Sequence, residues 1–427
     1  LQIVSMPSRL KLKLFILSFE IGGDKMRFGV NYIPSKKWLY SWADFDENSI
    51  REDIKAIKNL GFDHVRTHIL WNIFQPNENY VSELCLENLS KFTKICEEEK
   101  MDFFLTLFTG WMSGMVFMPP WLNIGGFDCW KKGMFSNKEA IKAEYYLIEK
   151  VAGVVAKSSA FLGFDLGNEL NCLFREEIDA DLTDDIADEW SHLMFKKCYE
   201  AAPEKLHSNG MGHSPWFGKT AMSRKTLAND GSITPVHAWV TFTGTSDKYG
   251  INGKETYRLP NYMIEMAKAY SEDANRMYQV QEFGMADQWF KTNEELENFI
   301  FGTLENCASD KNIWGVTWWC SHDIKQEFLG FVEFEHNLGL IDTENKPKQA
   351  GIIFKKFIDN YKAENYIQPQ PSKALVIQSG TGDECDFTNA QRYFDCYAKG
   401  ENVAFVTEEM KNNTDYLVSR GIKEIIE

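Results

Sequence analysis

Short apolar segments alternate with amphipathic segments along residues 26–361, and this alternation predicts an α/β fold, namely a closed (β/α)8 TIM barrel. Two further observations favour a barrel over its main rival, an open doubly wound sheet. The first turn, Gly29-Val30-Asn31, lacks the glycine-rich pattern that usually opens a doubly wound domain. Polar or aromatic residues also follow almost every predicted strand, and barrels carry their chemistry at those strand ends.

Eight strands are predicted from apolar runs that are bounded by turn residues or by helical patterns. In chain order they cover residues 26–32, 63–69, 101–108, 161–166, 205–209, 233–240, 277–281 and 312–319.

Helices are predicted where apolar residues recur every three or four positions, as in Ile50, Ile54 and Ile57. They cover residues 48–60, 84–99, 138–156, 183–202, 260–270, 293–308 and 349–361. A long loop of residues 109–135 interrupts the alternation. Long loops in compact domains are usually functional, so we expect the loop residue Trp111 to help bind the substrate.

The chain divides into four parts in this prediction. Residues 1–25 form an N-terminal extension or leader, residues 26–361 the barrel, residues 362–372 a linker, and residues 373–427 a small β-α-β-α unit. Two strands make a poor sheet alone. We therefore expect the small unit to pack on the barrel, on another subunit of a homo-oligomer, or on further residues.

The composition of the chain limits the kinds of partner that we expect it to bind. The net charge of −16 argues against nucleic acid and against an anionic membrane surface, and is compatible with a neutral substrate such as a carbohydrate. No run of about 18 apolar residues is present, so no segment is expected to span a membrane. The nine cysteines form no CxxC pair and fall mostly in predicted helices and strands, as buried thiols do. This usage predicts a cytoplasmic location, with secretion as the alternative if residues 1–25 are a leader.

Two predicted strands end in a glutamate. The first runs Phe161–Leu166 into Gly167-Asn168-Glu169, and the second runs Met277–Gln281 into Glu282 and Gly284. Burying a carboxylate without a partner costs several kcal/mol, so the position of each glutamate requires an explanation. Two carboxyl groups that face each other across a barrel are what hydrolysis of a glycosidic bond requires.

Several strand ends resemble those of clan A glycoside hydrolases, and most of all glycoside hydrolase family 5, the cellulase and mannanase family. Gly167-Asn168-Glu169 and Gln281-Glu282-Phe283-Gly284 resemble the paired catalytic segments of the clan. Val65-Arg66-Thr67 resembles the second-strand arginine of the family. His237-Ala238-Trp239 is similar to its sixth-strand His-x-Tyr, with tryptophan in place of tyrosine, and Trp318-Trp319 resembles its eighth-strand tryptophan. The resemblance covers residues 26–361.

The resemblance implies roles for these residues. Glu169 would be the general acid/base and Glu282 the nucleophile, kept ionised in part by Arg66. Asn168 would hydrogen-bond the sugar 2-hydroxyl. Trp318 or Trp319 would form the floor under the reacting sugar, and because neighbours on a strand alternate, one of the two must face the barrel exterior. His237 and Trp239 complete the implied substrate-binding set.

Two features depart from the usual pattern of family 5. The end of the third strand, residues 106–111, has no histidine, which most family 5 members carry there. The segment 71–76 looks more like exo-acting members of the clan.

These observations predict a retaining β-glycoside hydrolase that acts on β-linked mannose-, glucose- or galactose-containing oligosaccharides or polysaccharides, with no cofactor and no metal. The choice between exo and endo action stays open. Two other functions stay open as well. A non-catalytic saccharide-binding barrel would bind without turnover, and a metal-dependent sugar isomerase would need a cluster of His, Asp and Glu ligands at the strand ends.

Overall fold

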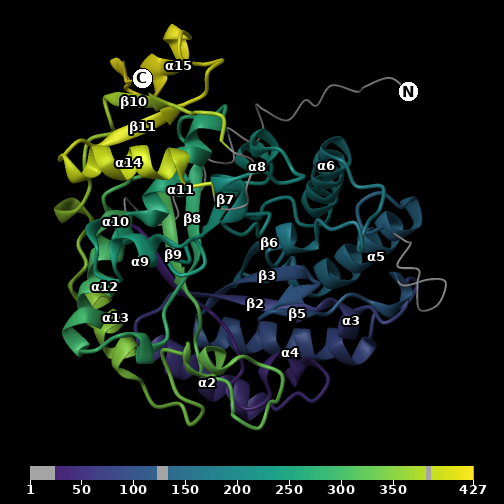
Figure 1. Cartoon of the computed structure of the whole chain (residues 1–427). Helices are drawn as coiled ribbons and strands as arrows, with labels where there is room; N and C mark the ends of the chain where they lie inside the picture. The colour runs from purple at the N-terminus through teal and green to yellow at the C-terminus, as the bar shows by residue number, and fades with distance from the viewer. Residues whose placement is uncertain (1–24, 123–132, 381–385, 427) are drawn as a thin grey trace.

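The computed structural model describes residues 25–122, 133–380 and 386–426 (Figure 1). The predicted leader, residues 1–25, therefore lies almost wholly outside the described residues.

The centre of the molecule is a curled parallel sheet, as the barrel prediction requires. Its strand order is β6-β3-β2-β1-β9-β8-β7, and every neighbouring pair is parallel. The strands are β1 (Arg27–Asn31), β2 (His64–Leu70), β3 (Asp102–Thr109), β6 (Phe161–Gly167), β7 (Ile233–His237), β8 (Met277–Phe283) and β9 (Ile313–Trp318).

Residues 205–209, predicted as a regular strand, close this sheet into a barrel through a single bridge between Asp165 and Ser208. The Ser208 amide donates to the Phe164 carbonyl oxygen at 2.9 Å. On the other side, the Ser232 amide donates to the His207 carbonyl oxygen at 2.8 Å. The closing segment lies so close to β6 that a Cβ on Gly163 would fall 1.2 Å from the Leu206 carbonyl oxygen, so only glycine fits there.

The long helices form the outer layer, and each predicted helix is confirmed to within two residues. They are α2 (Glu47–Asn59), α4 (Glu83–Glu99), α5 (Lys138–Val155), α6 (Asp184–Ala201), α11 (Leu259–Tyr270), α12 (Asn293–Ala308) and α13 (Gln349–Asn360). Capping side chains stabilise several of their starts: Ser82, Thr183 and Thr292 each accept a hydrogen bond from a backbone amide of the first turn. Within the described ranges, no helix has the length and apolar character needed to cross a bilayer.

Short elements on the loops escaped the sequence prediction, because one turn of helix is too short to show a period. The hairpin of β4 (Trp111–Met112) and β5 (Met115–Val116) follows β3, and the 3-10 helix η5 (Glu333–Asn337) lies in the loop after β9. Other short helices are α3 (Trp71–Phe74), α7 (Ser214–Phe217), α8 (Arg224–Asn229), α9 (Thr245–Tyr249) and α10 (Lys254–Tyr257).

The C-terminal unit contains the predicted β-α-β-α order and one additional strand. Its parallel sheet has the order β11-β10-β12, so the added strand completes a three-stranded sheet. The elements are β10 (Lys373–Val376), α14 (Thr388–Ala398), β11 (Val403–Val406), α15 (Thr414–Ser419) and β12 (Glu424–Ile426).

This unit packs on the barrel beside α11, which was the first of the expected alternatives (Figure 1). The ring of Tyr262 on α11 lies 5.9 Å from that of Phe405. A buried ion-pair network also joins the two parts. Glu265 on α11 accepts from Arg420 of the C-terminal unit at 3.2 Å and from Lys268 at 2.8 Å. The incomplete sheet thus has a partner within its own chain.

We predict that Glu265→Ala lowers the free energy of unfolding by about 3–5 kcal/mol, because Arg420 and Lys268 then stay buried with one anionic partner fewer. Urea unfolding followed by tryptophan fluorescence measures the loss. The matched control is Asp359→Ala, which removes an exposed pair with Lys355 and should cost less than about 1 kcal/mol. A Glu265→Ala loss no larger than the control would contradict the prediction.

Candidate active site

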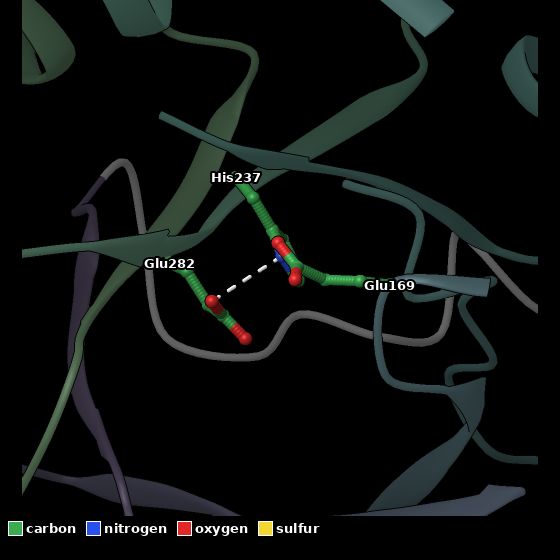
Figure 2. A group of neighbouring side chains, drawn as sticks. All are labelled: Glu169, His237 and Glu282. Atoms are coloured by element: carbon green, nitrogen blue, oxygen red, sulfur yellow. Dashed lines mark hydrogen bonds and ion pairs between the residues drawn. The ribbon is translucent and has the colours of Figure 1, made fainter. Parts of the chain in front are cut away.

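Glu169 and Glu282 converge at the carboxyl ends of the barrel strands. Figure 2 shows their side chains pointing toward each other, with His237 beside them. The nearest carboxylate oxygens and His237 Nδ1 all lie within 4.8 Å of one another. Retaining glycosidases hold their two carboxyl groups about 5–5.5 Å apart, and inverting enzymes about 6.5–9.5 Å apart. The separation here fits the retaining geometry.

Glu169 has an unusual backbone conformation. It follows β6 by two residues and has a φ of 46° and a ψ of 54°, in the left-handed region that side chains with a Cβ rarely adopt. Such a conformation costs of order 1–3 kcal/mol and persists only where the surroundings enforce it. The Glu169 amide donates to the Gly210 carbonyl oxygen at 2.8 Å, which fixes the turn. Strain of this kind is concentrated at functional sites.

Arg66 organises the floor of the site. Its guanidinium is fully buried and donates to Glu282 Oε1 at 2.7 Å and to Asp165 Oδ2 at 2.6 Å. It also donates to the side-chain oxygens of Asn31 and Asn168, both at 3.1 Å. The structure thus brings the predicted residues Arg66, Asn168 and Glu282 together. Sequence reasoning missed the supporting role of Asp165 and Asn31, although both lie on predicted strands.

His237 and Trp239 contact the two glutamates directly. His237 Nδ1 lies 3.2 Å from Glu169 Oε1 and 3.3 Å from Glu282 Oε2. The indole Nε1–H of Trp239 donates to Glu282 Oε2 at 3.1 Å. Arg66 donates to the other oxygen of Glu282, so each oxygen of this carboxylate accepts a hydrogen bond. Trp239 thus lies beside the carboxylates and orients Glu282.

The protonation states of Glu169, His237 and Glu282 depend on one another. Burial lowers the pKa of His237, but the charges of Glu282 and Glu169 outweigh it, so the pKa is raised overall. Burial opposes the ionisation of Glu169, yet the hydrogen bond from His237 and the charges of His237 and Arg66 together outweigh it and lower the pKa of Glu169. Burial raises the pKa of Glu282, although the charges of His237 and Arg66 act against it. Groups this close titrate as one unit.

The two neighbouring tryptophans face opposite sides of the barrel wall, as the alternation of a strand requires. Trp318 packs edge-on against Phe283 and against Phe354 of α13, so it lies in the helix layer and does not contact the site. Of the two tryptophans that were expected to bind sugar, Trp319 is therefore the remaining candidate. The Trp319 ring packs in one apolar cluster with Trp239.

Trp111, at the start of β4, lies beside the predicted 2-hydroxyl ligand. Its carbonyl oxygen accepts from Asn168 Nδ2 at 3.2 Å, and its half-buried ring lies 5.7 Å from the Arg175 guanidinium. The other described tryptophan of this loop, Trp121, is buried against Trp71 and is structural. Trp130 lies outside the described residues.

Aromatic side chains from three separate loops pack together in the apolar cluster that also contains Trp239 and Trp319. Trp38 follows β1, Phe117 follows the β4–β5 hairpin, and Phe331 follows β9. The Trp38 ring lies 5.5 Å from that of Phe117 and 5.0 Å from that of Phe331. These three residues, called the aromatic plug below, pack in the same apolar cluster as Trp319.

A third carboxyl group, Glu335, lies near the pair and was missed by sequence reasoning. Burial, together with the charges of Glu282 and Glu169, raises its pKa to about 7. Its sequence surroundings, the mixed apolar and polar residues 331–337 in the loop after β9, carry no motif that could have revealed it.

The expectation that no cluster of metal ligands exists needs correction, since Glu169, His237 and Glu282 come close enough together to hold an ion. The surroundings argue against that use. Both oxygens of Glu282 already accept hydrogen bonds, and the charge of Arg66, 2.7 Å away, repels a second cation. The donor set fits a sugar-cleaving pair better than a metal centre.

Comparison with known proteins was made by sequence and by structure. No protein-family model matches the sequence. Cellodextrinase A of Ruminococcus flavefaciens is 30% identical over 125 residues, which are 29% of this chain and 34% of that protein. The match thus spans about a third of the length of that relative.

Solved structures match over nearly the whole chain. A GH5_18 protein of Streptomyces cattleya, in complex with GlcNAc, superposes with a TM-score of 0.87 at 29% identity, covering 94% of this chain and 98% of that one. A GH5_18 protein of Bifidobacterium longum subsp. longum ATCC 55813 has a TM-score of 0.84 at 30% identity, covering 94% and 96%. Exo-beta-1,4-mannosidase Op5Man5 of Opitutaceae bacterium strain TAV5 shares the fold, with a TM-score of 0.73 at 21% identity, covering 90% and 69%. On this extent of similarity, the chain belongs to glycoside hydrolase family 5.

Proposed function

We propose that the protein is a retaining, exo-acting β-mannosidase that releases a terminal mannose from substrates of the Manβ1-4GlcNAc type. The observation that carries the proposal is the pair of buried carboxyl groups, whose nearest oxygens lie within 4.8 Å of each other. That separation suits a double displacement and leaves no room for the water that an inverting enzyme places between its carboxyl groups.

In the first step Glu282 attacks the anomeric carbon while Glu169 protonates the departing glycosidic oxygen. A bond between C1 and a Glu282 oxygen forms as the bond between C1 and the leaving oxygen breaks. Water then enters, Glu169 takes its proton as a base, and the oxygen displaces Glu282 from C1. The hydrogen bonds from Arg66 and Trp239 hold Glu282 in place throughout.

Donation requires the proton on Glu169, whereas in the ligand-free structure the pKa of Glu169 is lowered and that of Glu282 is raised. When a sugar enters, the proton held among Glu169, His237 and Glu282 must therefore move to Glu169. His237 is placed for this transfer, since its Nδ1 lies within 3.3 Å of an oxygen of each carboxylate.

Mannose is favoured over glucose and galactose by the GH5_18 relatives. Variants of the Streptomyces cattleya and Bifidobacterium longum proteins, each 29% identical to this chain, are described in complex with Manb1-4GlcNAc. The Asn168 side chain, expected at the sugar 2-hydroxyl, is oriented by both Arg66 and the Trp111 carbonyl group. The 2-hydroxyl is where mannose differs from glucose.

Exo action is supported by the aromatic plug. The leaving group must lie beside its proton donor, Glu169, so the sugar to be released extends to the opposite side of the site. In the closed ring of eight strands, β9 lies opposite β6, which leads into Glu169. The plug residue Phe331 follows β9, and Trp38 follows the adjacent strand β1. Both plug residues therefore come from the side on which a longer chain would continue, which supports release of a single terminal sugar.

The reducing compartment expected from the cysteine pattern remains part of the proposal. All cysteines within the described ranges are free thiols, most of them buried, which supports a cytoplasmic location.

We predict that Glu282→Ala lowers kcat/KM on any β-mannoside by at least about a thousandfold, and that Glu169→Ala does so on substrates whose leaving group needs a proton, such as Manβ1-4GlcNAc. Azide distinguishes the two roles. It should rescue Glu282→Ala with formation of the α-mannosyl azide, and Glu169→Ala with formation of the β-mannosyl azide, as read by NMR. Substrates with a good leaving group should also restore the first step of Glu169→Ala alone. Full activity of either variant would refute the pair.

We predict that Trp239→Phe moves the acidic limb of the kcat/KM profile to higher pH. The indole N–H bonds the ionised form of Glu282, so its removal raises the pKa of Glu282, and the nucleophile then needs a higher pH to ionise. Trp314→Phe, at the amino end of β9 and remote from the site, is the control and should keep the wild-type profile. An unshifted limb in Trp239→Phe would contradict the assignment.

We predict that prolonged incubation with EDTA leaves kcat/KM on the aryl β-mannoside unchanged, because the donors of Glu282 are protein groups and not an ion. The measurement compares treated enzyme with enzyme supplied with divalent cations. Loss on chelation, with recovery on addition of a metal, would favour the metal-dependent alternative.

A further inference from the structure

Glu335 is a buried acidic side chain that the proposed mechanism does not use. It lies on η5 in the loop after β9, is 8% exposed, and is close enough to Glu282 and Glu169 for their charges to act on it. A third carboxyl group beside two others is electrostatically unfavourable, so its position needs a physical reason.

Few groups of the protein compensate for the burial of the Glu335 carboxyl group. Ser113 Oγ donates to Glu335 Oε2 at 3.0 Å, and among the described residues this is the one hydrogen bond to the carboxyl group. No cation in the described ranges forms an ion pair with it. Oε1 therefore remains available to a ligand, and a carboxylate oxygen is a strong acceptor for sugar hydroxyl groups.

The position of Glu335 relative to the scissile bond follows from the strand order. Its loop begins at β9, opposite the strand that leads into Glu169 and hence away from the leaving group. Ser113 lies at the tip of the β4–β5 hairpin, just before the plug residue Phe117. The Ser113–Glu335 hydrogen bond thus joins the loops that supply the plug residues Phe117 and Phe331, and holds the carboxyl group beside the plug.

We propose that Glu335 recognises the non-reducing end of the substrate by accepting a hydrogen bond from the 4-hydroxyl of the sugar bound over Trp319. This inference rests on the proposed exo-mannosidase function. In a pyranose the 4-position lies across the ring from the anomeric carbon, so with C1 at Glu282 the 4-hydroxyl points toward the plug. That hydroxyl carries the next sugar in a longer β-1,4-linked chain and is free at a chain end.

The test combines Glu335→Gln with a substrate that lacks the hydroxyl. Wild type and Glu335→Gln are assayed on 4-nitrophenyl β-mannoside and on its 4-deoxy analogue. On the parent substrate Glu335→Gln should lower kcat/KM roughly 10- to 100-fold, the value of a hydrogen bond to a charged acceptor. On the 4-deoxy substrate the loss should be less than about twofold, because the partner is already missing. Equal losses on both substrates overturn the proposal.

Two control variants separate recognition from structure. Glu333→Gln, an exposed change on the same 3-10 helix, should leave kcat/KM unchanged on both substrates. Ser113→Ala removes the protein donor and keeps the carboxylate, so it should retain the preference for the parent over the 4-deoxy substrate. If Glu335→Gln fails to fold, Glu335→Asp takes its place, and its loss should likewise be confined to the parent substrate.

Failure of the proposed function is recognised separately in the wild-type protein. A wild type that cleaves another aryl β-glycoside and not the mannoside refutes the mannose assignment alone. The same four assays are then run on that sugar and its 4-deoxy analogue, where equal losses again overturn the role of Glu335.

Discussion

The buried charge of Arg66 is the constraint on which the rest of the site depends. A guanidinium with no exposed surface must be matched by anions and acceptors, or the barrel centre would lose several kcal/mol. Asp165 and Glu282 supply the charge, and Asn31 and Asn168 accept further hydrogen bonds. Because these bonds satisfy the cation, they also fix the orientations of Glu282 and Asn168. Stability and positioning of the site are achieved by the same contacts.

Contacts among the site residues also determine their proton equilibria. Glu169, His237 and Glu282 come from three strands that are distant in sequence, and each changes the charge state of the others. Arg66 keeps one side of this unit positive, and the partly exposed side chain of Glu169 faces the opening. A ligand that enters between the carboxyl groups therefore changes the proton distribution as well as the contacts. Binding and activation of the acid are coupled by electrostatics, with no movement of the backbone required.

The sequence predicted those features that repeat or that end a strand. Long helices showed their period and their caps, and Glu169 and Glu282 stood out as carboxylates after apolar runs. Glu335 did not, because it lies on an irregular loop whose path is set by tertiary contacts with Trp38 and Ser113. Residues 205–209 showed as a strand, and the backbone hydrogen bonds of Leu206 and Ser208 to β6 confirm that they complete the barrel. Which of Trp318 and Trp319 faces inward depends on strand register, which pattern alone leaves open.

The presence of tryptophan at position 239, where the family pattern has tyrosine, changes what the neighbour of Glu282 can do. An indole N–H donates one hydrogen bond, cannot accept one, and does not ionise in water, whereas a phenol loses its proton near pH 10. The group beside Glu282 therefore keeps the same polarity under alkaline conditions, and never becomes a competing anion or a stray nucleophile toward the sugar. The bulkier ring also packs against the exposed ring of Phe242 at 5.3 Å, which links the neighbour of Glu282 to the protein surface.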